Sequence, residues 1–82
     1  MNKLNFMITD CANEIARYYL RSVKGGYNIP DYTKAKYITD VTNLICERKH
    51  CGVRFLGKDE IAARVTEYVE NHMSKFLTML NK

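Results

Sequence analysis

The fold is decided by one stretch, KDEIAARVTEYVENHMSKFLTML, which spans residues 58–80. Its apolar positions recur every three or four residues, as they do on an amphipathic helix. The side chains on this sector are Ile61, Ala62, Val65, Tyr68, Val69, His72, Met73, Phe76, Leu77, Met79 and Leu80. The sector covers roughly half of the helix circumference, whereas a helix on one core needs a stripe of about 100°. We therefore predict one helix over 58–80 with more apolar surface than a single small core can cover.

An earlier segment with the helical pattern covers residues 4–23, and Gly25 and Gly26 follow it as a stop signal. Its apolar face contains Leu4, Ile8, Cys11, Ala12, Ile15, Tyr18, Tyr19 and Val23. Phe6 and Leu20 fall off this face, so they are candidates for exposed apolar contacts. The spacing thus predicts a long first helix with its own apolar face.

The middle segment covers residues 32–49, with Asp31 or Thr33 as its N-cap. Its stripe contains Ile38, Val41, Leu44 and Ile45, with Ala35 and Tyr37 beside it. Three antiparallel helices with short connections are the simplest way to bury three apolar faces. We predict an all-α fold, in which residues 1–82 form a small single-domain bundle of three main helices with short connections.

Composition and charge limit the classes of protein to which the chain can belong. The chain has 82 residues and a net charge of +4, and 46% of its residues are hydrophobic. No run without a charged residue exceeds six positions, far short of the about 20 apolar residues of a membrane span. The N-terminus lacks the apolar core of a secretory signal, and Cys11, Cys46 and Cys51 have no disulfide-framework spacing. We expect a cytoplasmic protein with free thiols and no membrane insertion.

Cys46, His50, Cys51 and His72 are residue types that bind zinc, but their spacing is not that of a zinc site. The same residues lack the third, orienting group of a Cys-His nucleophile, and neither Gly25-Gly26 nor Gly57-Lys58 belongs to a phosphate-binding loop. The sequence therefore predicts no metal, no cofactor and no catalytic residue, and a protein that is not an enzyme.

A nucleic-acid alternative rests on residues 57–65, which read like the first helix of a helix-turn-helix. A second helix would then present Asn71, His72, Ser74 and Lys75. However, residues 66–68 contain no glycine, the apolar stripe continues through them, and Glu67 and Glu70 oppose phosphate binding. A small DNA-binding regulator stays an alternative, although nucleic acid is not the partner that we expect.

A protein partner is favoured by basic residues near the ends of the first two helices and by apolar residues at the margins of the third. Tyr68, Val69, His72, Met73 and Phe76 form its expected core-facing spine. The candidate partner-binding residues are Arg17, Leu20, Arg21, Arg48, Lys49, Arg54, Ile61, Leu77 and Met79. They suit an amphipathic helical segment, bound by apolar burial with basic residues at the rim. The surplus apolar surface also leaves a homodimer open.

As a whole chain, the sequence resembles the T-even phage lysis-inhibition accessory proteins, a family of small cytoplasmic antiholins. The resemblance rests on the length, on the opening MNKLNFMITD, on the helix with Tyr18 and Tyr19, and on an uninterrupted helical C-terminus. It implies a protein of the host cytoplasm that binds the cytoplasmic N-terminal region of the phage holin. By this binding it would delay holin assembly and inhibit host lysis.

Overall fold

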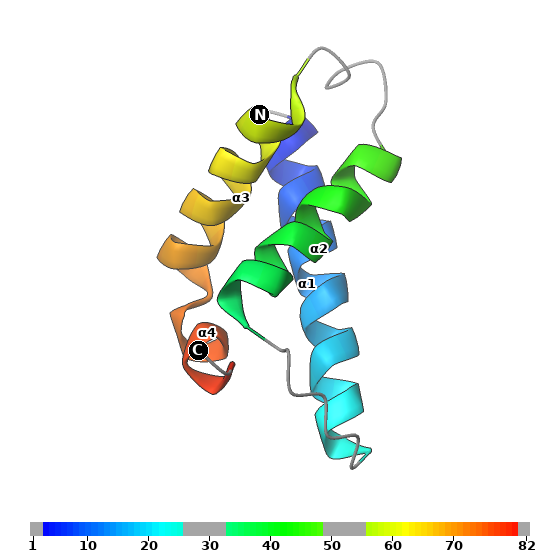
Figure 1. The fold of residues 1–82 in the computed structure, drawn as a ribbon, viewed down its shortest axis with the longest axis vertical. Coiled ribbons are helices and arrows are strands. Elements are labelled where there is room, and N and C mark those ends of the chain that lie inside the picture. The colour runs from blue at the N-terminus through cyan, green and yellow to red at the C-terminus, as the bar shows by residue number, and fades with distance from the viewer. Residues whose placement is uncertain (1–2, 26–32, 49–55, 81–82) are drawn as a thin grey trace.

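The computed structural model describes residues 3–25, 33–48 and 56–80, and the elements in these ranges are helices. The helices are α1 (Lys3–Lys24), α2 (Lys34–Glu47), α3 (Lys58–His72) and the short α4 (Ser74–Met79). No strand occurs in these ranges. In Figure 1, α2 crosses α1 at an angle, α3 lies to one side of both, and α4 turns in below the end of α3. The predicted all-α fold with three main helices is confirmed.

α1 matches the predicted first helix to within one residue at each end. Its buried side chains follow helical spacing and are Leu4, Ile8, Cys11, Ala12, Ala16 and Tyr19. Arg21 and Lys24 in the last turn suit the negative end of the helix dipole, and the Gly25 amide donates to the Arg21 carbonyl at 2.9 Å. One expectation was wrong, because the Tyr18 side chain is 58% exposed and does not belong to the buried face.

α2 begins after Thr33, whose hydroxyl accepts a hydrogen bond from the Lys36 amide at 3.1 Å. Thr33 is thus the N-cap of the two candidates, and the helix is shorter than the predicted 32–49. The buried face is centred on Tyr37, Val41 and Ile45, while Ile38 and Leu44 are only half-buried. The buried face of α2 is therefore rotated about the helix axis relative to the predicted stripe. Tyr37 is at its centre because the phenol crosses to α1 and donates to the Ala12 carbonyl at 2.6 Å.

The C-terminal stretch differs most from its prediction, since it is two helices and not one. Met73 separates α3 from α4 with φ −129° and ψ 32°, outside helical geometry. α3 buries Ile61, Val65 and Val69 completely, one per turn. Ile61 was expected at an exposed margin, but it belongs to the core. His72, expected on the core-facing spine, is exposed.

The core lies where α1, α2 and α3 meet, and α2 packs against both other main helices. Tyr19 of α1 donates a short hydrogen bond to the Asp40 carboxylate of α2. Asp40 also pairs with Lys36 at 2.9 Å, and the Lys36 ammonium lies 5.8 Å from the centre of the Tyr19 ring. Burial of apolar side chains therefore stabilises the core. The polar network of Tyr19, Asp40 and Lys36 fixes how α1 and α2 cross.

Candidate partner-binding surface

The C-terminal half of α1 carries a shallow depression of about 390 Å³ lined by Arg17, Leu20, Arg21 and Lys24. We call this surface the basic hollow. Positions 17, 20, 21 and 24 share one face of a helix because they are three, four and seven residues apart. The three cationic side chains are exposed and Leu20 is half-buried. The hollow therefore combines an apolar residue with a rim of positive charge.

None of the three cations of the basic hollow has an ion-pair partner within residues 3–25, 33–48 and 56–80. Their charges are thus available to a ligand. Tyr18 lies on the same helix outside the lining of the hollow, and its exposed ring is tilted against Tyr19 at 6.2 Å between ring centres. An exposed aromatic side chain beside arginines is typical of protein interfaces.

Arg48 is in a different position from the cations of the hollow. Its guanidinium pairs with the Glu14 carboxylate at 2.9 Å and so joins the end of α2 to α1. Burial raises the pKa of the neighbouring Cys11 thiol, and the positive charge of Arg48 partly offsets this shift. Lys49 and Arg54, predicted in the same basic cluster, lie outside the described residues. Of these three candidate partner-binding residues, Arg48 is the one within the described ranges, and it makes a contact within the fold.

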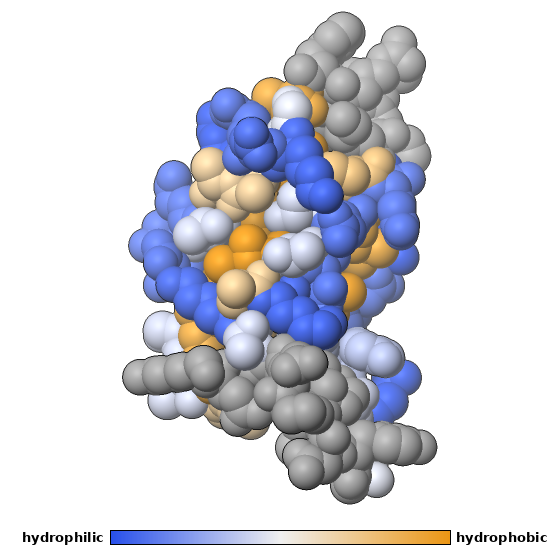
Figure 2. All heavy atoms as spheres, in the orientation of Figure 1, coloured by the Kyte–Doolittle hydropathy of each residue, from blue (hydrophilic) through white to orange (hydrophobic). Residues whose placement is uncertain are grey.

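The three apolar margin residues fall into different environments. Ile61 has no exposed surface, so as a partner-binding residue it is a wrong prediction. Leu77 is half-buried and packs against the core from α4. Met79 is 64% exposed. On the face shown in Figure 2, hydrophobic side chains form separate spots between hydrophilic ones.

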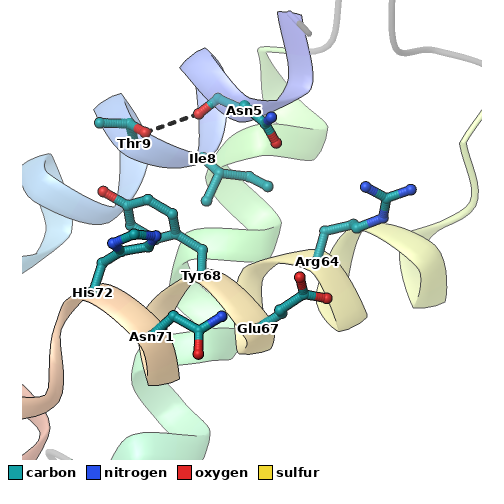
Figure 3. Close-up of a pocket in the computed structure, with 8 residues that line it drawn as sticks. All are labelled: Asn5, Ile8, Thr9, Arg64, Glu67, Tyr68, Asn71 and His72. Atoms are coloured by element: carbon teal, nitrogen blue, oxygen red, sulfur yellow. Dashed lines mark hydrogen bonds between the residues drawn. The ribbon is translucent and has the colours of Figure 1, made fainter.

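A second depression, of about 320 Å³, lies between the start of α1 and α3 (Figure 3). It is lined by Asn5, Ile8, Thr9, Arg64, Glu67, Tyr68, Asn71 and His72. The Thr9 hydroxyl donates to the Asn5 carbonyl at 2.9 Å, and the Tyr68 and His72 rings lie 4.8 Å apart. Sequence reasoning missed this groove because its two walls are about sixty positions apart in the chain. Its mixed donors and acceptors give it no single preferred ligand charge.

The residues considered for metal binding are not gathered in the described part of the chain. Cys46 is half-buried on α2 and His72 is exposed at the end of α3, while His50 and Cys51 lie outside the described residues. Within the described ranges, no group of three or more His, Cys, Asp or Glu side chains could hold a metal ion.

Burial raises the pKa of the Tyr37 phenol, and the nearby Tyr68 adds to the shift. Tyr37 therefore stays neutral in the core.

The helix-turn-helix alternative can be compared with α3 directly. α3 continues without a break through residues 66–68, where that motif needs its turn. Asn71 and His72 therefore lie on the same helix as Arg64. Ser74 and Lys75 belong to α4, which has only six residues. The two-helix arrangement that the alternative requires is not present at this place.

Comparison with known proteins adds no assignment. No protein-family model matches the chain, and neither curated proteins nor solved structures give a significant match. Within the described residues, no helix combines the length and the apolarity that crossing a bilayer requires. The surfaces described above therefore supply the candidate binding sites.

Proposed function

We propose that this protein is a non-enzymatic antiholin of the host cytoplasm. In this proposal it binds the cytoplasmic N-terminal region of a phage holin, delays holin assembly and so inhibits host lysis. The proposal takes its partner from the resemblance of the whole sequence to the T-even lysis-inhibition accessory proteins. It takes its binding surface from the structure.

The observation that carries the proposal is the basic hollow. Arg17, Arg21 and Lys24 surround Leu20 and have no ion-pair partner in the described part of the chain. An amphipathic helix with an apolar residue over Leu20 and carboxylates at its edges would match both the shape and the charge.

Such binding inhibits assembly without any chemical step. A protein that binds the unassembled holin and not the assembled form lowers the concentration of free holin. Assembly is then delayed by mass action for as long as the complex persists. Because the rim contacts are between exposed charges, the affinity is expected to fall as the salt concentration rises.

The test is calorimetric titration of the full chain with a soluble peptide of the holin N-terminal region. We expect wild-type protein to bind, and the double variant Arg17→Glu, Arg21→Glu to bind at least about tenfold more weakly. Lys75→Glu, which reverses one charge where the double variant reverses two, is the control, because Lys75 is also exposed but lies on α4. The control should bind like wild type.

Two results would contradict parts of the proposal. Absence of heat and of any thermal stabilisation at high peptide concentration would reject the holin segment as the partner. Equal weakening by the α1 double variant and by Lys75→Glu would retain the partner but reject the basic hollow as its site.

A further inference from the structure

The break between α3 and α4 is not explained by a glycine or a proline, although Asn71, His72 and Ser74 beside it are weak helix formers. It occupies the single residue Met73, and neither glycine nor proline occurs in residues 58–80. Sharp helix breaks normally arise at such residues. Neither side of the break is stabilised by a side-chain cap, since Met73 makes no capping hydrogen bond to α4. The apolar pattern of residues 58–80 also fits one continuous helix. The break must therefore be maintained by contacts made elsewhere.

Those contacts come from an aromatic cluster formed by Phe76 of α4, Tyr37 of α2 and Tyr19 of α1. The Phe76 ring lies 4.8 Å from the Tyr37 ring and 6.3 Å from the Tyr19 ring, measured between ring centres. The Tyr37 hydroxyl also lies 3.3 Å from the Met73 sulfur. By contrast, α4 has no buried residue of its own. A few side chains thus hold α4 in its folded-back position.

We propose that α4 is an exchangeable element. In a second state, residues 58–79 form one straight helix, and α4 packs on Tyr19 and Tyr37 of a second copy of this chain. Two copies that exchange α4 in this way form a domain-swapped dimer. The aromatic cluster is rebuilt in both halves from the same residues as in the single chain.

One energetic contribution favours exchange, and it acts against the entropy that two chains lose on association. The contacts of Phe76 are the same in both states, so they cancel. Straightening gives the first amides of α4 helical partners among the last carbonyls of α3, which a helix end otherwise leaves without intrahelical bonds. A one-residue hinge cannot fold back while it is helical, so a straight helix must place α4 away from its own core. Short hinges of this kind are those that promote swapping.

The occupant is a second copy because α4 is already complementary to the surface that it covers. Phe76, Leu77 and Leu80 are half-buried there and pack against the core. An identical α4 from another chain fits without any change of sequence. This inference uses a surface separate from the basic hollow, so it stands independently of the proposed holin partner.

The test compares Met73→Ala with Met73→Gly in the full chain. Both variants remove the thioether from Tyr37, so they differ only in the helix propensity of the hinge. Because two hinges straighten per dimer, we expect alanine to give a dimer association constant about 20-fold larger than glycine. Sedimentation velocity over a concentration series measures this ratio, and circular dichroism checks that both variants are folded.

A third variant keeps Met73 and lengthens the hinge by inserting Gly-Gly-Ser between Met73 and Ser74. The longer hinge lets α4 reach its own core even while residue 73 is helical, so the insertion should abolish any dimer that the wild type forms. Equal dimerisation of the alanine and glycine variants, or dimerisation unaffected by the insertion, would show that any dimer forms by another surface. Strictly monomeric wild-type and alanine variants up to millimolar concentration would also overturn the proposal.

Discussion

α3 and α4 share one helical sequence pattern, but the fold holds them in different ways. α3 buries Ile61, Val65 and Val69 completely, and Lys34 of α2 pairs with Glu70 on its surface at 2.6 Å. α4 buries no residue fully, and within the described chain it has no ion pair. Periodicity therefore predicts which face of a helix is apolar, whereas contacts with residues distant in the sequence decide where the helix bends.

The largest expected effect separates the two segments by their core contacts. Ile61→Ala should lower the free energy of unfolding by about 3 kcal/mol, because it removes a fully buried side chain and leaves a cavity. Leu77→Ala should cost only about 1 kcal/mol, since its side chain is half-buried and solvent can fill the space. Urea unfolding measures both values. Equal losses would mean that α4 belongs to the core as fully as α3 does.

Ile61 also shows what sequence could and could not predict. The three main helices, Thr33 as one of two cap candidates, and most of the buried face of α1 follow from local spacing and capping chemistry, which residues a few positions apart determine. Ile61 was misplaced because a helical wheel shows which residues share a face, but not which of them meet the other helices.

The break at Met73 and the position of Tyr37 could not be predicted for a related reason. Both depend on the aromatic cluster, whose members come from three different helices. Of the candidate site, the residues of the basic hollow follow from spacing on one helix. The groove between α1 and α3 does not, because its walls approach each other only in the folded chain.

A smaller effect is expected where α4 meets the rest of the fold. Tyr37→Phe keeps the ring but removes the hydroxyl that donates to the Ala12 carbonyl and contacts Met73. We expect Tyr37→Phe to lower the free energy of unfolding by about 1 to 1.5 kcal/mol. In this variant, backbone amides should exchange hydrogen faster in α4 than in α3. Tyr18→Phe is the matched control on an exposed tyrosine, and it should change stability by less than about 0.5 kcal/mol. Similar exchange rates in the two helices would remove the distinction between them.

The same phenol predicts a loss of stability in alkali. Burial raises the pKa of Tyr37 above its ordinary value of 10.0, so the unfolded chain ionises first. The stability that the neutral Tyr37 phenol contributes to the fold is fully present below pH 10.0. It is lost as pH rises from there toward the raised pKa. At about pH 10.5 the loss from this residue should be about 0.8 kcal/mol relative to neutral pH. Tyr37→Phe should lack this component of the pH profile, and identical slopes for the two proteins would contradict it.

The smallest expected effect concerns the ion pair between Lys34 and Glu70, which joins α2 to α3. Both side chains are about half exposed, at 46% and 52%, so water and salt screen their attraction. Glu70→Gln should therefore cost no more than about 0.5 kcal/mol relative to Glu67→Gln, a control on the same helix without an ion pair in the described residues. This difference should disappear in concentrated salt. If it instead reached about 2 kcal/mol and resisted salt, the pair would be a principal anchor of α3. The contrast with α4 would then rest on charge, and not on the depth at which Ile61, Val65 and Val69 are buried.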